Sequence, residues 1–213
     1  MDCMEGMKQF PDKYFELAIV DPPYGIKMDG GKIGGDNLGT AKNYTKKNWD
    51  SSAPEQEYFN ELKRVSKNQI IWGANHFINK IPFDSPCWIV WDKDNTGNFA
   101  DCELAYTSFP TAVRIFRYRW NGMLQENMKN KEHRIHPTQK PVELYQWLLT
   151  KYAKKGDKIL DTHVGSASSL IACHEFGFDY VGFELDKEYF NKATERLKQV
   201  KDQMSLFDFT ARI

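Results

Sequence analysis

The sequence predicts an α/β fold built on a doubly wound, mostly parallel sheet with helices on both faces and an antiparallel edge. Short apolar runs bounded by polar or turn residues recur along the chain, and stretches with helical spacing of apolar residues lie between them. The runs are apolar throughout, which is typical of strands buried on both faces of a parallel sheet. We expect a single domain over residues 1–213.

The expected strands occupy residues 17–20, 69–72, 87–91, 159–160 and 180–183. The expected helices, which share apolar residues at spacings of three and four, occupy residues 55–65, 142–152, 168–176 and 187–203. Two strand-like runs around Phe109 and Pro110 interrupt the alternation of strands and helices within residues 103–118. This stretch predicts the antiparallel strands at one edge of the sheet.

The chain is electrically neutral, because 29 lysines and arginines balance 29 aspartates and glutamates, so bulk charge gives no general attraction to nucleic acid or anionic membrane. No apolar stretch approaches the roughly 18 residues that span a bilayer, and two early acids argue against a signal peptide. We therefore expect a cytoplasmic protein with no membrane partner. Four separated cysteines predict reduced thiols, and His133 and His136 lack further ligands, so no metal is expected.

Two local segments are nevertheless basic. Seven basic residues against two acidic ones lie within residues 108–140, and arginines alternate there with aromatic residues, which would place several cations on one face of a strand. An edge strand with solvated charges explains the same pattern. Residues 27–48 contain five glycines and five lysines with almost no apolar residue, and predict a mobile loop that could act as a lid.

The first chemical motif, D-P-P-Y-G at residues 21–25, directly follows the expected strand at residues 17–20. Ligands bind at the carboxyl ends of strands in open α/β sheets. Pro22 and Pro23 remove two N–H donors and stiffen the turn, whose carbonyl groups then act as acceptors. With the Asp21 carboxylate and the Tyr24 ring, they predict a site for a planar group that carries an amine, unless the turn is only structural.

The second motif, K-I-L-D-T-H-V-G-S-A-S at residues 158–168, is an apolar strand that opens through small residues into a helix. Small residues allow the backbone to approach a ligand, and a helix N-terminus offers N–H groups to a carboxylate or phosphate. Glu184 follows Gly165 by 19 residues, close to the spacing at which an acid binds ribose hydroxyls. A third motif, H-P-T-Q-K-P at residues 136–141, precedes an expected helix, but its chemistry alone does not identify a ligand.

In this order the three motifs resemble the amino-group DNA methyltransferases of the permuted, or beta, class, which modify adenine N6 or cytosine N4. The resemblance covers residues 2–197 and implies a seven-stranded methyltransferase-type sheet with S-adenosylmethionine as cofactor. Residues 1–3 are similar to the family's G-D-C-L segment, whose acid contacts the cofactor adenine. Within the family's D-P-F-x-G-S-G-T motif, this chain has Thr162 for Pro, His163 for Phe, Ala167 for Gly and Ser168 for Thr.

The resemblance also implies the roles of individual residues. Catalysis is expected from Asp21, Pro22, Pro23 and Tyr24. Cofactor binding is expected from Asp2, Cys3, Thr138, Gln139, Lys140, Asp161, His163, Val164, Gly165, Ser166, Ala167, Ser168 and Glu184. A small target-recognition insert is expected at residues 109–135, and the expected DNA contacts are Lys42, Lys46, Lys47, Arg114, Arg117, Arg119 and Arg134.

The implied reaction is direct methyl transfer to the exocyclic amine of a base flipped out of double-stranded DNA, with Tyr24 stacked on that base. D-P-P-Y favours adenine N6 in this family, whereas S-P-P-Y favours cytosine N4, so we predict an adenine-specific DNA methyltransferase. Cytosine N4 methylation, methylation of RNA or of a protein amide, and an inactive DNA-binding module are the alternatives.

The C-terminal pentapeptide Q-M-S-L-F at residues 203–207 resembles the motif that binds the bacterial sliding clamp, with Gln203, Leu206 and Phe207 as the expected contacts. Docking of these apolar residues back onto the domain is the alternative. The short recognition insert implies a short target site or a homodimer, so both monomer and homodimer stay open.

Overall fold

The structure, a computed structural model, describes residues 1–33, 42–81, 84–95, 100–121 and 124–210. The side chains of residues 32, 33, 42 and 204–210 are outside the described part. Those of Lys42, Leu206 and Phe207, which the sequence assigned to DNA and to a sliding clamp, are among them.

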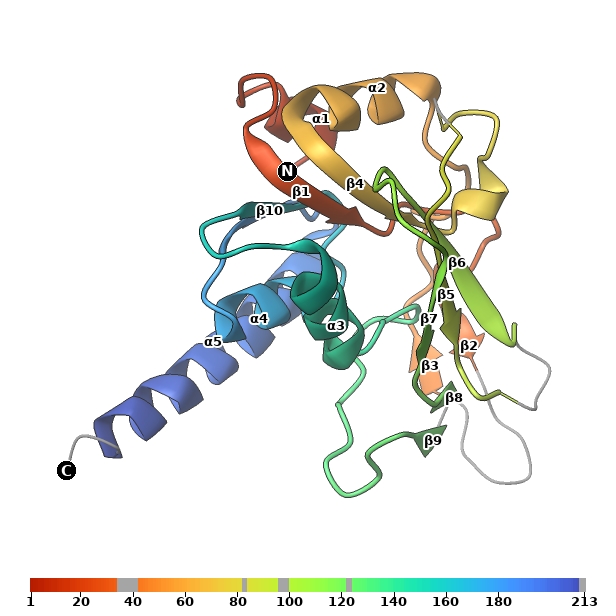
Figure 1. Cartoon of the computed structure of the whole chain (residues 1–213). Helices are drawn as coiled ribbons and strands as arrows, with labels where there is room; N and C mark the ends of the chain where they lie inside the picture. The colour runs from red at the N-terminus through yellow and green to blue at the C-terminus, as the bar shows by residue number, and fades with distance from the viewer. Residues whose placement is uncertain (34–41, 82–83, 96–99, 122–123, 211–213) are drawn as a thin grey trace.

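A seven-stranded sheet confirms the predicted fold class, with the order β11-β10-β1-β4-β6-β5-β7 (Figure 1). Its strands are β1 (Phe15–Val20), β4 (Ser66–Trp72), β5 (Trp88–Asp92), β6 (Cys102–Thr107), β7 (Arg114–Arg117), β10 (Lys158–Asp161) and β11 (Asp179–Gly182). The strands β11, β10, β1 and β4 are parallel, and Ala18 of β1 pairs with Leu160 on one side and Gln69 on the other. Each of the five strands expected from an apolar run is therefore present.

The antiparallel edge predicted from residues 103–118 is present in part. β6 runs antiparallel to both β4 and β5, whereas β7, the last strand, is parallel to β5. The two strand-like runs thus do not pair with each other, because β5 lies between them.

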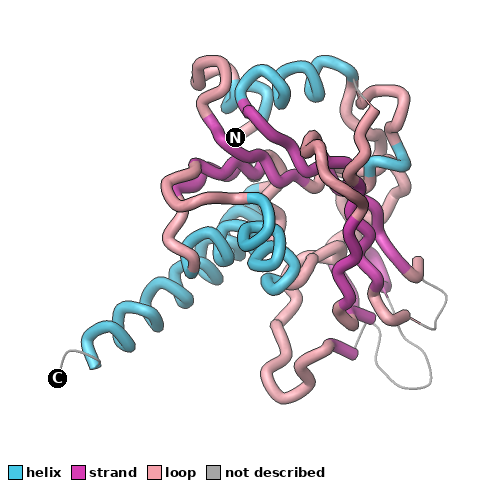
Figure 2. Tube along the Cα trace, in the orientation of Figure 1, coloured by secondary structure: helices cyan, strands magenta, loops and turns pink. Residues whose placement is uncertain are grey.

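The helices cover both faces of the sheet (Figures 1 and 2). Their bounds are α1 (Cys3–Met7), α2 (Gln56–Val65), α3 (Val142–Tyr152), α4 (Ser168–Glu175) and α5 (Lys187–Thr210), with a short 3-10 helix η1 (Ala74–His76). Alternate residues of β1 serve the two cores: Ala18 and Val20 pack with α1 and α2, whereas Leu17 and Ile19 pack with α3 and α4. This double covering explains why residues 17–20 of β1 are all apolar.

Two short hairpins complete the fold. β2 (Gly31–Ile33) pairs with β3 (Lys42–Tyr44) inside the segment expected to be a mobile loop, and residues 34–41 between them lie outside the described part. β8 (Trp120–Asn121) pairs with β9 (Leu124–Gln125) inside the expected recognition insert. Helix α5 extends seven residues beyond its expected end at residue 203, and its C-terminal part projects away from the rest of the molecule (Figure 1).

Among the helices of the described residues, we find none whose length and hydropathy would allow it to cross a bilayer.

Candidate functional site

The sheet brings the first two motifs together. β1 ends at Val20 and β10 ends at Asp161, and these parallel strands are neighbours, so the turns that follow them lie at the same edge of the sheet. We call residues 21–25 the Asp21 turn and residues 162–168 the Gly165 turn. Both turns follow from the local sequence, because prolines in one and small residues in the other end the strands.

The Asp21 carboxylate has a partner on each oxygen. The Tyr24 hydroxyl donates to Asp21 Oδ1 at 2.6 Å, and the Lys140 ammonium donates to Asp21 Oδ2 at 2.6 Å. Lys140 Nζ also lies 3.2 Å from the Tyr24 hydroxyl oxygen. Burial raises the pKa of Asp21 above its ordinary value, and the Lys140 charge opposes this effect. The structure thus places Lys140, which the sequence assigned to the cofactor, on the carboxylate of the first motif.

Lys140 connects Asp21 to a second buried carboxylate that the sequence did not single out. Its ammonium lies 2.8 Å from Glu103 Oε2 on β6, and Glu103 also pairs with Lys93. Burial disfavours the charge of Glu103, yet the two ammonium groups hold its pKa down at about 2. Two carboxylates and two lysines therefore form one charge-balanced network. Glu103 is a charged residue in an otherwise largely apolar strand, and this signal could have identified it.

The Tyr24 ring packs against residues 73–76, which follow β4. It stacks on His76 of η1 with ring centroids 4.9 Å apart and planes 15° apart. Gly73 makes room for it: a Cβ atom there would lie 2.0 Å from Tyr24 Cε1, and the backbone has φ +66°. Tyr24 is expected to stack on a flipped base, and its ring already stacks on His76, a residue that none of the three motifs contains.

The Gly165 turn is held by two acids. Glu184 accepts hydrogen bonds from the backbone N–H groups of Gly165 and Asp186, each at 2.8 Å. Asp161 is buried and accepts from the His163 N–H at 2.9 Å and from the Ser169 hydroxyl, and burial raises its pKa to about 7. Asp161 therefore shapes the turn from inside.

Ala167 occupies the second glycine position of the family motif. Its backbone has φ +63°, in the left-handed region, directly before α4. Its side chain packs in a small cluster with Val164, Leu170 and Ala193. The extra methyl group, expected where backbone and ligand approach, thus packs against protein.

A pocket of about 330 Å³ lies beside both turns. Its lining residues come from four segments: Cys3 and Met4, Pro23, residues 52–58, and His163. His163 Nδ1 lies 2.9 Å from the Thr162 hydroxyl, and burial lowers the pKa of His163 to about 4, so the ring is neutral near pH 7. Asp2 is exposed and caps α1 through the N–H groups of Met4 and Glu5. The pocket thus combines the Tyr58 and His163 rings with the carboxylates of Glu55 and Glu57.

The third motif is adjacent to the Gly165 turn. His136 is buried, its ring lies 4.3 Å from the Tyr189 ring, and a Cβ atom on Gly165 would lie 3.6 Å from it. Thr138 donates its hydroxyl or N–H toward His136 Nδ1. Gln139 was expected to contact the cofactor, but its side-chain oxygen accepts from the Ile135 N–H at 2.9 Å and its backbone carbonyl accepts from Trp120 Nε1 at 2.8 Å. Gln139 thus contacts Trp120 and Ile135, which lie within the expected recognition insert.

The expected DNA contacts differ in whether they pair with acidic residues of the protein. Arg114 and Arg117 of β7 are both exposed, and Arg117 pairs with Asp92 at 3.3 Å. The two arginines are three residues apart and so lie on opposite faces of the strand, which corrects the prediction of one cationic face. Lys46 is exposed as well.

Three further cations of this group also contact the protein itself. Lys47 pairs with Asp186 at 3.0 Å and Glu188 at 2.9 Å, and Arg119 pairs with Asp94. Arg134 lies over the Trp120 ring at 4.5 Å, and burial lowers its pKa. The positive charge available to DNA in these segments is therefore smaller than the number of lysines and arginines implies. Within the described residues, no group of three or more His, Cys, Asp or Glu side chains is arranged to hold a metal ion.

Comparisons with known proteins find DNA methyltransferases among the proteins similar to this chain. A family model described as DNA methylase, of the N6/N4 methyltransferases, matches residues 111–195. The type II methyltransferase M.HpaI of Haemophilus parainfluenzae is 28% identical over 233 residues, which cover 92% of this chain and 72% of that protein.

Two solved structures share the fold. The complex of M1.HpyAVI with SAM has a TM-score of 0.58 at 21% identity and covers 92% of this chain and 96% of that chain. The PvuII DNA methyltransferase, named cytosine-N4-specific, has a TM-score of 0.61 at 12% identity and covers 95% of this chain and 88% of that chain.

Proposed function

Because the chain is an S-adenosylmethionine-dependent DNA methyltransferase of the N6/N4 class, we propose that it methylates the exocyclic N6 of adenine in duplex DNA. One observation carries the choice of adenine. The residue that precedes P-P-Y is Asp21. Its carboxylate lies at the end of β1, where Tyr24 donates a hydrogen bond to one oxygen and Lys140 to the other.

Asp21 acts as the acceptor for the amine. An exocyclic amine is a poor nucleophile because its lone pair is delocalised into the ring, and acceptors on its hydrogens draw the nitrogen toward tetrahedral geometry. Asp21 and the Pro22 carbonyl provide such acceptors, and the buried carboxylate offsets the positive charge that develops on nitrogen. Each carboxylate oxygen keeps a second lone pair beside its bond to Tyr24 or Lys140.

Lys140 keeps Asp21 ionised for this role. A buried carboxylate tends to take up a proton, and an ammonium at 2.6 Å opposes that. Glu103 and Lys93 balance the remaining charge of the network.

The pocket and the Gly165 turn would hold the cofactor, which supplies a methyl group bound to a sulfonium. Pro23, Tyr58 and His163 provide ring surfaces against which the adenine could lie, and Glu55 and Glu57 lie in the same lining. Glu184 has lone pairs left for ribose hydroxyls, and the first turn of α4 presents backbone N–H groups to a carboxylate.

The recognition insert and β7 would contact DNA. Arg114, Arg117 and Lys46 are exposed cations suited to phosphate contacts, which give affinity but carry no sequence information. The flipped adenine would enter beside Tyr24 and His76, where an aromatic surface already exists.

The test is to identify the methylated product. Mixed-sequence duplex DNA is incubated with methyl-labelled S-adenosylmethionine, digested to nucleosides and analysed by mass spectrometry. We expect N6-methyladenine. N4-methylcytosine as the labelled nucleoside would overturn the proposal, as would absence of labelled DNA despite cofactor binding, which would point to RNA or protein; absence of cofactor binding would point to an inactive module.

A companion variant tests the role of Asp21. Asp21→Ala should lose on the order of 100-fold or more in turnover, in the range typical of lost transition-state hydrogen bonds, while it still binds S-adenosylhomocysteine. Asp12→Ala is the matched control, because Asp12 is 77% exposed and forms only a surface pair with Arg64. Full turnover in Asp21→Ala would exclude the assigned role.

A further inference from the structure

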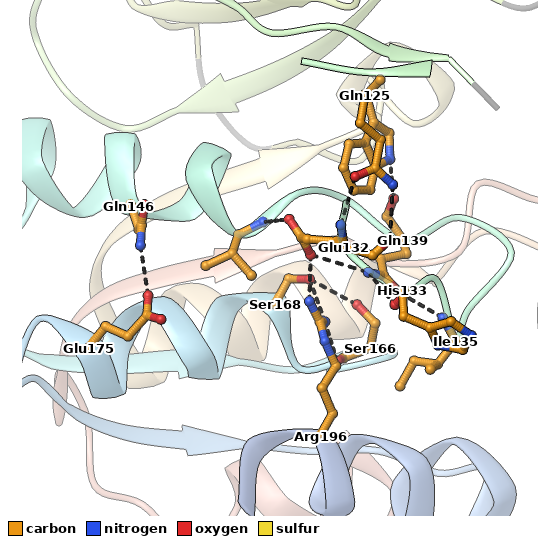
Figure 3. Close-up of polar contacts among 12 residues, drawn as sticks. Gln125, Glu132, His133, Ile135, Gln139, Gln146, Ser166, Ser168, Glu175 and Arg196 are labelled. Carbon is orange, nitrogen blue, oxygen red and sulfur yellow. Dashed lines mark hydrogen bonds and ion pairs between the residues drawn. The ribbon is translucent and has the colours of Figure 1, made fainter. Parts of the chain in front are cut away.

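Arg196 of α5 binds the Gly165 turn from below. One of its terminal nitrogens donates to the Ser166 carbonyl oxygen at 2.8 Å and to the Ser168 hydroxyl at 2.9 Å (Figure 3). These atoms belong to the segment that the proposed function assigns to the cofactor. Arg196 belongs to none of the three motifs, and α5 is a largely polar helix, so the sequence analysis did not identify this residue.

The second terminal nitrogen of Arg196 pairs with Glu132 Oε2. Both side chains are only 16% exposed. Burial lowers the pKa of Arg196 and raises that of Glu132, and each charge offsets the effect of burial on the other. The pair is therefore stable only while both charges are held together, because either one alone would be a buried, uncompensated ion.

Glu132 belongs to the expected recognition insert and is hydrogen-bonded to another residue of it, Gln125. Its carbonyl oxygen accepts from Gln125 Nε2 at 3.0 Å, and its N–H donates to Gln125 Oε1 at 2.8 Å (Figure 3). Its other carboxylate oxygen accepts from the N–H of Val142, the first residue of α3, at 2.8 Å. A continuous series of polar contacts thus runs from the β8–β9 hairpin through Glu132 and Arg196 to Ser166.

We propose that the Glu132–Arg196 ion pair couples the recognition insert to the Gly165 turn, so that DNA and cofactor each strengthen the binding of the other. A ligand that orders the turn also orders Arg196 and, through it, Glu132. The partner ligand then meets a segment that is already ordered, and the same gain applies in both directions. This inference rests on the proposed function, because it assigns the two ligands to these segments.

The test is a double-mutant cycle on the coupling itself. Binding of S-adenosylhomocysteine, which permits no methyl transfer, is measured by calorimetry with and without duplex DNA for the wild type, Arg196→Gln, Glu132→Gln and the double variant. In the wild type, DNA should tighten binding about fivefold or more. In each variant this factor should fall below about twofold, and the double variant should lose no more than either single one, since all three lack the same contact.

The double variant also addresses folding. It removes both charges of the pair together, and its two amides can still hydrogen-bond, so it should fold where a single variant fails to. Arg64→Gln is the matched control: Arg64 likewise binds carboxylates and backbone carbonyl groups, but at the far end of α2. It should keep the wild-type coupling factor.

The outcomes separate the two proposals. Wild-type coupling that persists in the folded double variant, or a wild type without coupling, would overturn this inference even if N6-methyladenine is formed. A wild type that forms no methylated DNA would overturn the proposed function instead. As a kinetic readout, Arg196→Gln should raise the KM for S-adenosylmethionine more than it lowers kcat, because Arg196 contacts the turn and none of the reacting atoms.

Discussion

Lys140→Met removes the cation that lies 2.6 Å from Asp21 and 2.8 Å from Glu103. Methionine is unbranched and adaptable, so the change in packing is small compared with the change in charge. The lysine side chain is 4% exposed, and water therefore has little access to the two carboxylates that remain. Removing one partner of a buried ion pair costs about 3–5 kcal/mol, and we expect a loss of that size in the free energy of unfolding at pH 8.

The loss should depend on pH. Burial raises the pKa of Asp21, and removing Lys140 raises it further. An acid whose folded-state pKa is raised stabilises the protein below its unfolded pKa, and this contribution is lost as pH rises through the folded pKa. The deficit of Lys140→Met should thus be largest at high pH and shrink in acid by up to about 1.4 kcal/mol per pH unit. Since only ionised Asp21 accepts from the amine, the acidic limb of kcat/KM should move to higher pH.

Urea unfolding and methylation kinetics across pH 5.5–8.5 measure both effects. Lys151→Met, which removes an exposed lysine from the last turn of α3, is the control and should resemble the wild type. Adding Glu103→Gln to Lys140→Met removes one excess negative charge, so stability should recover in part while activity stays low. An unchanged free energy of unfolding together with an unchanged acidic limb would refute the role of Lys140.

Two further predictions concern partners. Arg114→Ala should weaken DNA binding at low salt and reduce the slope of log affinity against log salt by about 1, because each lost phosphate contact removes about one unit; a slope equal to that of the wild type would exclude Arg114 from the interface. Leu206→Ala combined with Phe207→Ala should abolish binding to a purified bacterial sliding clamp and leave methylation of short duplexes unchanged, whereas undiminished clamp binding would refute the assignment of the C-terminal motif.

The strands could be predicted because their signal is local. A strand segment buried on both faces must be apolar, and residues 17–20 of β1, 70–72 of β4 and 159–160 of β10 satisfy that requirement whatever their neighbours are. Their order in the sheet could not be predicted in the same way. β6 lies between β4 and β5 and runs against both, and this depends on pairing between segments that are distant in the chain.

The same distinction between local and long-range signals applies to the candidate site. The Asp21 turn and the Gly165 turn each consist of consecutive residues whose types limit what the backbone and side chains can bind. Lys140 lies 119 residues from Asp21, and its pairing with that carboxylate follows only from the packing of the third motif against β1 and β6. Glu132 and Arg196, 64 residues apart, were missed for the same reason.

The sequence by itself therefore predicted the fold class and located the three motifs, because residue type and short-range spacing are sufficient for those. The chemistry assigned to the motifs came from their resemblance to a family. The tertiary structure decided what each charge does. Lys47 and Arg119 have acidic partners of their own, Lys140 serves a carboxylate, and Arg114 stays exposed. The physical reason is that the effect of a charge depends on burial and on the nearest opposite charge, and the fold sets both.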